Sequence, residues 1–162
     1  MANEYLRARE TPIGPGEPAP DFTLLDQDRK EWTLSEAVKA GDVVLCFFPL
    51  AFTGVCGTEM KCITSELEGW KARGARVVGV SCDSFAALKA WAEKEGFRHT
   101  LLSDMHRQVC RAYGLYWPEL NVAARGTVVI ARAPDGKGRV KWSQRREPKV
   151  AMEWNAVIAS LA

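Results

Sequence analysis

The chain holds five cysteines, and their number and spacing decide which sulfur chemistry is available to it. They are Cys46, Cys56, Cys62, Cys82 and Cys110. An odd number of cysteines in a chain that is not secreted argues against a disulfide framework. A zinc site uses closely spaced cysteine and histidine ligands, whereas this sequence has no C-x-x-C pair and only two histidines. We therefore expect no metal and no cofactor, and the chemistry depends on which cysteine is reactive.

Cys56 stands where a buried strand is expected to lead through a loop into a helix. The apolar run from Val43 to Phe48 is typical of a strand that is buried on both faces. A helix from about Cys56 to Arg73 is predicted by one apolar stripe, made of Cys56, Met60, Ile63, Leu67 and Trp70. The first turn of a helix exposes unpaired N–H groups and the positive end of the helix dipole. Both favour the thiolate of Cys56, which is the nucleophilic form of cysteine.

Two neighbours in the loop can assist this sulfur. Thr53 precedes Cys56 by three residues, and in a tight turn its hydroxyl is expected beside the sulfur, where it can donate to a thiolate or hold a substrate oxygen. Pro49 follows the strand directly and is expected to shield the sulfur from bulk water. Because burial alone disfavours a thiolate, the site also needs a positive partner, which spacing alone does not identify.

The remaining elements predict an α/β sandwich in one domain over residues 1–162, with residues 1–18 as an extended lead-in. Further strands are expected at residues 21–25, 31–34, 76–81, 101–102 and 127–131 and around Val140 and Trp142. Further helices are expected from Ser35, at 84–96, at 105–113 and from Pro148, with a last buried face at Val150, Trp154, Val157, Ile158 and Leu161. This order fits a thioredoxin-like fold, with a central mixed sheet flanked by helices, although periodicity does not separate it from a flavodoxin-like one.

Composition excludes several classes of partner. The net charge of +2 gives no general electrostatic case for nucleic acid. The longest apolar run, residues 43–52, is too short to span a membrane, and the first residues have no apolar core that would act as a signal peptide. We therefore expect a cytoplasmic protein without a membrane segment.

The histidines, one tryptophan and a run of basic residues have expected positions as well. Both histidines, His99 and His106, are expected at the surface. Trp117 is expected to line the active site or a dimer contact. The basic residues near the last hairpin predict a solvated face or, as the alternative, a surface for an acidic partner; they are Arg132, Lys137, Arg139, Lys141, Arg145, Arg146 and Lys149.

Pro49, Thr53 and Cys56 match the P-x-x-x-T-x-x-C motif of peroxiredoxins, and the stretch PLAFTGVC resembles the AhpE-type one-cysteine branch of that family. Further similar segments follow in the family order and cover the chain from about Gly16 to its end. They are APDFTLLD (19–26), VVGVSCDS (77–84), LLSD (101–104), AYGL (112–115) and ARGTVVI (124–130). Three motif positions alone are weak, whereas the ordered segments together make a strong resemblance.

The resemblance implies roles for single residues. Cys56 is similar to the peroxidatic cysteine, whose thiolate attacks a hydroperoxide and becomes a sulfenic acid. Arg125 matches the arginine whose guanidinium faces that thiolate, and Glu59 matches an acidic position that orients the arginine. The family further implies a homodimer and an external thiol reductant, which is thioredoxin, a glutaredoxin or mycoredoxin-like protein, or a low-molecular-weight thiol.

The thiol that resolves the sulfenic acid stays open at this point. Where a related branch often carries a second cysteine, five residues after the first, this chain has Lys61. Cys62 lies roughly 240° around the helix and about 9 Å along it, beyond the usual disulfide reach of about 7 Å, so a bond would require unwinding. Cys82 and Cys110 are the other candidates for the resolving cysteine, whereas Cys46 is expected to pack in the core. A one-cysteine cycle, in which an external thiol resolves the sulfenic acid, is favoured.

Two other functions compete with a peroxidase. A thioredoxin-type thiol–disulfide oxidoreductase is disfavoured because the chain lacks a C-x-x-C pair. A redox sensor or a holdase-like assembly on the same fold is the alternative, in which oxidation of Cys56 signals and does not turn over.

Overall fold

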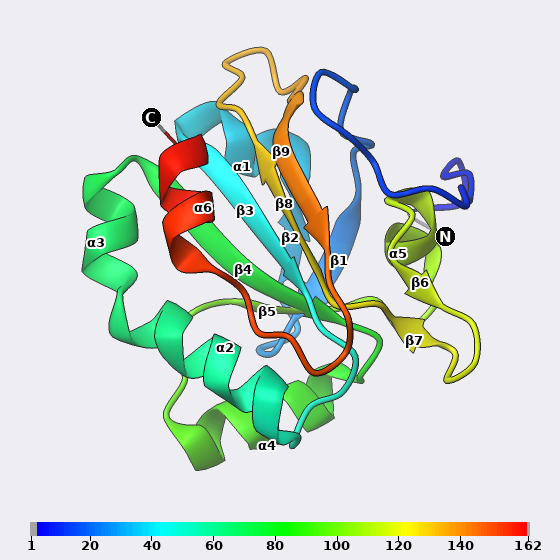
Figure 1. Cartoon of the computed structure of the whole chain (residues 1–162), viewed down its shortest axis with the longest axis vertical. Helices are drawn as coiled ribbons and strands as arrows, with labels where there is room; N and C mark the ends of the chain where they lie inside the picture. The colour runs from blue at the N-terminus through cyan, green and yellow to red at the C-terminus, as the bar shows by residue number, and fades with distance from the viewer. Residues whose placement is uncertain (1–2, 162) are drawn as a thin grey trace.

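The computed structural model describes residues 3–161, which form a mixed seven-stranded sheet between helices (Figure 1). Met1, Ala2 and Ala162, the ends of the predicted domain, lie outside the described residues. The strand order is β2-β1-β5-β4-β3-β8-β9, and β6 and β7 pair separately. The strands are β1 (Thr23–Asp26), β2 (Glu31–Thr33), β3 (Asp42–Phe47), β4 (Ala75–Ser81), β5 (Leu101–Ser103), β6 (Tyr116–Trp117), β7 (Val122–Ala123), β8 (Gly126–Ile130) and β9 (Val140–Arg145).

Helices cover both faces of the sheet, so the predicted α/β class with a central mixed sheet is confirmed. On one face lie α2 (Gly54–Ser65), α3 (Leu67–Ala72), α4 (Phe85–Glu95) and α6 (Trp154–Ser160) (Figure 1). On the other face lie α1 (Leu34–Ala40) and α5 (Gln108–Ala112). No helix of residues 3–161 has the length and apolar character needed to cross a membrane.

Strand β3 is an inner strand of the sheet, next to the central β4, and carries the site loop at its end. It runs parallel to β4 and antiparallel to β8, so Val44 lies between Val77 and Val129. Residues 43–47 are all buried, and their side chains alternate between the two core clusters on either face. This is why the strand is an uninterrupted apolar run instead of an alternating one.

Three helices differ from the predicted ones, and one of them is the helix expected over 105–113, which spans only Gln108–Ala112. The helix expected over 56–73 begins at Gly54 and is broken at Glu66 into α2 and α3. The last helix begins at Trp154 and not at Pro148, and Val150 is exposed. Residues 148–152 stay outside the helix because their peptide groups bond buried side chains: the Pro148 and Val150 carbonyls accept from arginines, and the Met152 amide donates to a carboxylate.

The lead-in, of which residues 3–18 are described, is less extended than expected and is tied to the domain. Ile13 is only 1% exposed and packs in the core, and its amide donates to the Tyr113 carbonyl at 3.0 Å. Pro18 forms an isolated bridge with Arg139.

The prediction of a surface position is correct for His106 and wrong for His99. His99 is 3% exposed; its Nδ1 lies 2.6 Å from the Thr64 hydroxyl and its Nε2 lies 3.2 Å from the Met60 sulfur. Burial lowers the pKa of His99 to about 3. A neutral imidazole can bond at both nitrogens, which lets α2 pack over a polar ring.

This burial predicts a defined pH dependence of stability. In the unfolded chain His99 titrates near pH 6.5, whereas in the folded chain it titrates near 3, so the stability it contributes is complete above about pH 6.5 and is lost as the pH falls toward 3. We expect a slope of up to about 1.4 kcal/mol per pH unit in that window, absent in His99→Gln. Urea unfolding of both proteins from pH 4 to pH 8 measures it; a difference that does not change with pH would contradict a buried neutral His99.

Candidate active site

Cys56 is the third residue of α2, and its amide precedes the hydrogen-bond ladder of that helix. Thr53 caps the helix, and the first helical bond runs from the Gly57 amide to the Thr53 carbonyl at 2.8 Å. The N–H groups of the first turn therefore have no partner within the helix, and they give this end its partial positive charge. Cys56 is 1% exposed, so its sulfur sits at a helix start that is closed to bulk water.

The loop between β3 and α2 is held by its own polar contacts. Pro49 is buried two residues after the end of β3. The Ala51 amide donates to Asp83 Oδ2 at 3.0 Å. Phe52 adopts a left-handed backbone with φ of 62°, a conformation that costs a residue with a side chain about 1 kcal/mol. Strain at Phe52, four residues before Cys56, indicates that the loop geometry is fixed by its surroundings.

Thr53 differs from its expected placement. Its hydroxyl is exposed and donates to the Leu50 carbonyl at 2.7 Å. Within residues 3–161 no hydrogen bond joins this hydroxyl to the Cys56 sulfur. A hydroxyl has one proton, and because that proton is directed at Leu50, Thr53 here fixes the loop and presents lone pairs only.

Arg125 is the residue before β8, and its side chain contacts the sulfur of Cys56, 69 positions earlier in the sequence. Its Nη2 lies 3.0 Å from Sγ, its Nε donates to the Pro148 carbonyl at 2.8 Å, and its Nη1 donates to Glu59. Arg125 is 3% exposed, and every nitrogen of its guanidinium has an acceptor. This is the arrangement that the sequence resemblance implies for Arg125, and spacing gave no sign of it.

Glu59 lies one turn after Cys56, is 2% exposed and joins two arginines. Its Oε1 accepts from Arg125, and its Oε2 accepts from Arg146 Nη2 at 2.7 Å and from the Met152 amide at 2.8 Å. The carboxylate therefore fixes Arg125 from the side away from the sulfur.

Arg146 is the residue that sequence reasoning missed, because it was assigned to a solvated basic face. Its side chain is 3% exposed, and it also donates to the Thr127 hydroxyl at 3.0 Å and to the Val150 carbonyl at 3.2 Å. The signal was the alternation of β9, which carries Trp142 and Gln144 to one face and reaches that face again at position 146. The other basic residues near this hairpin are exposed or half-buried.

The charges of Arg125, Arg146 and Glu59 do not cancel within this buried group. Two guanidinium groups and one carboxylate leave one uncompensated positive charge, and a buried net charge is costly. A thiolate at Cys56 makes the group neutral. Cys46, which lies nearby in the same core cluster, has a different environment, because burial raises the pKa of its thiol and its nearest polar neighbours are uncharged.

A pocket of about 330 Å³ lies beside Arg125. It is lined by Trp117, Arg145 and Pro148, among others, so Trp117 lies near Arg125, and its expected place at the active site or a dimer contact stays a prediction. The pocket gives a small molecule a place next to the guanidinium that contacts the sulfur.

The remaining cysteines lie away from this group. Cys62 is half-buried on α2, and all five cysteines are free thiols. Cys82 and Cys110 belong to the core cluster on the opposite face of the sheet from Cys56. A bond from Cys56 to either of them would have to join side chains that pack on opposite faces of the sheet.

Two adjacent arginines test the buried group. Arg146→Gln leaves the Glu59 carboxylate with one charged partner fewer, and we expect a loss of about 3 kcal/mol in the free energy of unfolding. Arg145→Gln is the matched control, because that side chain is exposed, and its effect should stay within about 0.5 kcal/mol. Guanidinium unfolding measures both; equal losses would contradict a structural role for the Arg146–Glu59 pair.

Comparison with known proteins gives a consistent set of relatives. The AhpC/TSA family matches residues 15–142. Alkyl hydroperoxide reductase E of Mycobacterium tuberculosis is 34% identical over 151 residues, which cover 90% of this chain and 96% of the relative. Peroxiredoxin-2 of Macaca fascicularis is 38% identical over 133 residues, which cover 76% of this chain and 65% of the relative. The crystal structure of peroxidoxin BcpB from Mycobacterium tuberculosis superposes with a TM-score of 0.82 at 27% identity, over 92% of this chain and 96% of that one.

Proposed function

Because the chain belongs to the AhpC/TSA family and is a thiol-dependent peroxidase of the peroxiredoxin kind, we propose that Cys56 is its peroxidatic residue. The family also confirms the predicted thioredoxin-like fold. The observation that carries the proposal is the 3.0 Å contact between Arg125 Nη2 and Cys56 Sγ inside a buried group that the thiolate neutralises. The sensor, holdase and thioredoxin-type readings are not favoured by these relatives.

The proposed reaction uses the groups around the sulfur in order. The Cys56 thiolate attacks the terminal oxygen of a hydroperoxide, so that an S–O bond forms while the O–O bond breaks. The leaving alkoxide or hydroxide takes up a proton and departs as alcohol or water, and Cys56 becomes a sulfenic acid. Negative charge moves from sulfur onto oxygen, and donors aimed at that oxygen lower the barrier.

Each neighbour has a separate task in this proposal. Arg125 and the Cys56 amide donate to the developing oxyanion. Glu59 is a positioning residue, because it holds Arg125 and touches neither sulfur nor substrate. Thr53, with its proton on Leu50, accepts the O–H of the hydroperoxide and orients it. Pro49 keeps bulk water away from the sulfur, as its burial after β3 permits.

We propose a one-cysteine cycle in which an external thiol reduces the sulfenic acid. This proposal is supported by the positions of the other cysteines. Cys82 and Cys110 pack on the opposite face of the sheet from Cys56, and Cys62 lies on the same helix as Cys56, beyond disulfide reach while that helix is intact. The reductant is a thioredoxin, a glutaredoxin or mycoredoxin-like protein, or a low-molecular-weight thiol.

The assembly and the compartment are proposals of the same kind. A homodimer through the site loops is supported by the exposed apolar side chains of Leu50 and Phe52. A cytoplasmic location is supported by five cysteines that are all thiols, since reducing compartments keep them so.

Replacing the nucleophile tests the proposed function directly. We expect Cys56→Ser to lower the rate of hydroperoxide consumption by more than about 10⁴-fold, since serine is not ionised at this position and no other thiol contacts Arg125. Cys62→Ser is the control and should leave the rate unchanged. Stopped-flow measurement with hydrogen peroxide and an organic hydroperoxide decides it; a Cys56→Ser protein as fast as the parent would refute the proposal.

The mass of the product tests the cycle. After one equivalent of hydroperoxide, the tryptic peptide 40–61 should gain one oxygen, which a sulfenic-acid trap locates on Cys56. A mass lower by two hydrogens that joins this peptide to 62–71 would show instead that Cys62 resolves the sulfenic acid after α2 unwinds.

A further inference from the structure

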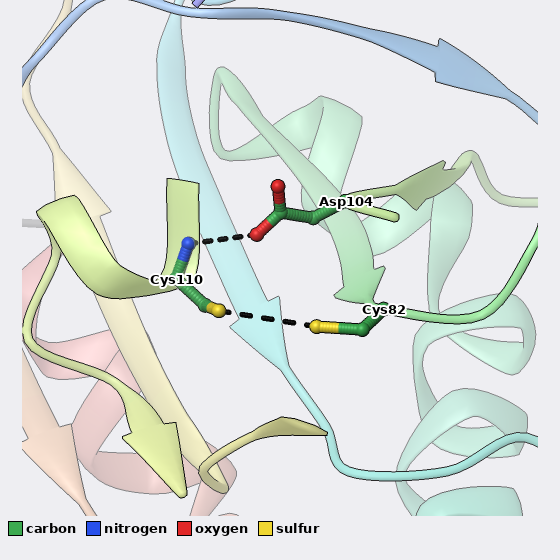
Figure 2. Close-up of side chains that lie close together, drawn as sticks. All are labelled: Cys82, Asp104 and Cys110. Atoms are coloured by element: carbon green, nitrogen blue, oxygen red, sulfur yellow. Dashed lines mark hydrogen bonds between the residues drawn. The ribbon is translucent and has the colours of Figure 1, made fainter. Parts of the chain in front are cut away.

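Cys82 and Cys110 belong to the core cluster on the opposite face of the sheet from Cys56. Figure 2 shows these two cysteines with Asp104. Cys82 follows β4 directly, Cys110 lies in α5, and their sulfurs are 3.9 Å apart although 28 positions separate them in sequence. A carboxylate oxygen of Asp104 lies within 4.8 Å of both sulfurs. All three side chains are buried, and Cys82, at 8% exposure, is the one nearest to solvent.

We propose that Cys82 and Cys110 are a second redox centre, a dithiol that hydroperoxide converts into an intramolecular disulfide. The peroxidase site does not use this pair, because Cys56 packs in the other core cluster with Met60 and Val129. The oxidant is the chemical class that the protein already meets as a peroxidase.

The geometry requires only a small movement. A disulfide needs its sulfurs about 2.05 Å apart, so the present gap must close by about 1.9 Å. One cysteine stands in the turn after β4 and the other on a helix of five residues. Neither belongs to the central strands, so two short elements share the shift. Two thiols held in contact also react at a high effective concentration.

The chemistry balances with hydroperoxide as the only co-reactant. The Cys82 sulfur forms an S–O bond as the O–O bond breaks, and the Cys82 thiol proton passes to the leaving oxygen, which gives Cys82 sulfenic acid and an alcohol or water. The Cys110 sulfur then attacks the Cys82 sulfur, the S–O bond breaks, and the hydroxyl leaves as water with the Cys110 proton. Asp104 can carry that proton, because burial raises the pKa of its carboxyl and makes it a stronger base than an exposed aspartate.

This pair reacts after Cys56, and only with excess hydroperoxide. The contact with Cys82, together with burial, raises the pKa of the Cys110 thiol above its ordinary range. Buried protonated thiols are poor nucleophiles, so the pair lacks the activation that Arg125 gives to Cys56. The two centres therefore respond to different amounts of the same oxidant.

An ion is a weaker account of the same three side chains. Two sulfurs and one carboxylate supply three ligands within the described part of the chain, and a structural zinc site uses four. The Asp104 oxygens already accept from the amides of Val109 and Cys110, at 3.2 and 2.8 Å. These bonds explain the carboxylate as the group that holds the start of α5.

Oxidation of the pair acts close to the active-site loop. Asp83, the residue after Cys82, accepts from the Ala51 amide in the loop that precedes Cys56. A disulfide at Cys82 therefore forms one residue from a contact that fixes this loop.

Peptide mapping of the full chain tests the proposal. The parent and Cys56→Ser are treated with one equivalent and then with an excess of hydrogen peroxide. They are then denatured in the presence of an alkylating reagent that blocks free thiols, and digested with trypsin. Cys82 lies in peptide 77–89, Cys110 in 108–111, and Cys46 and Cys56 in 40–61, so the pair is read separately from the peroxidase site. We expect 77–89 joined to 108–111, with two hydrogens lost, under excess peroxide in both proteins, and released by a dithiol reductant.

Two cysteine variants test whether the link joins Cys82 to Cys110. Cys62→Ser should keep the link, whereas Cys82→Ala should abolish it and leave Cys110 alkylated. If both peptides are recovered fully alkylated under excess peroxide, the thiols are inert or shielded by a bound ion, and the proposal is overturned. So would a Cys82 that gains oxygen while Cys110 stays alkylated. Since Cys56→Ser lacks the proposed peroxidase nucleophile, a failure here is distinct from a failure of the proposed function.

Discussion

The interaction on which the rest of this structure depends is a buried balance of charge. Two guanidinium groups, from Arg125 and Arg146, enclose one carboxylate, from Glu59, and their charges sum to zero only when the Cys56 sulfur is a thiolate. Bringing charges out of water is costly unless they pair well, so this group constrains every segment that contributes to it. It joins α2, the start of β8 and the end of β9, and it takes the peptide groups of residues 148–152 as further partners. The same bonds that favour an ionised sulfur therefore also keep this last segment from becoming helical.

The five cysteines differ in their surroundings. Cys56 and Cys46 lie in one core cluster, yet only Cys56 contacts a guanidinium, and burial keeps Cys46 protonated. Cys82 and Cys110 lie on the opposite face of the sheet, where each has the other as its sulfur neighbour. The sheet thus separates a thiol that contacts a guanidinium from a pair of thiols that contact each other.

Local sequence signals predicted much of this, and they failed where distant groups meet. The apolar run of β3 and the stripe of α2 predicted the strand and the helix that flank the site loop, because each depends on neighbours in sequence. Arg125 was reached through resemblance alone, since nothing near it points to a sulfur 69 residues away. Arg146 and His99 were misplaced because charged and polar side chains are usually exposed, and only tertiary partners, Glu59 for one and Thr64 for the other, make their burial favourable. The start of α6 was misplaced for the same reason, because Pro148 looks like a helix start until its carbonyl is seen to bind Arg125.

The central claim is that the Arg125 guanidinium activates the Cys56 sulfur, and the rate of reaction with hydroperoxide tests it most directly. Stopped-flow fluorescence of the parent, Arg125→Met and Arg125→Lys, each first shown to be folded by its unfolding transition, gives the second-order rate constant. Loss of one preorganised donor should slow Arg125→Met by about 10²- to 10³-fold, and Arg125→Lys should recover part of that loss because it restores the charge without the fork of donors. An Arg125→Met protein that reacts with hydroperoxide as fast as the parent would contradict the account.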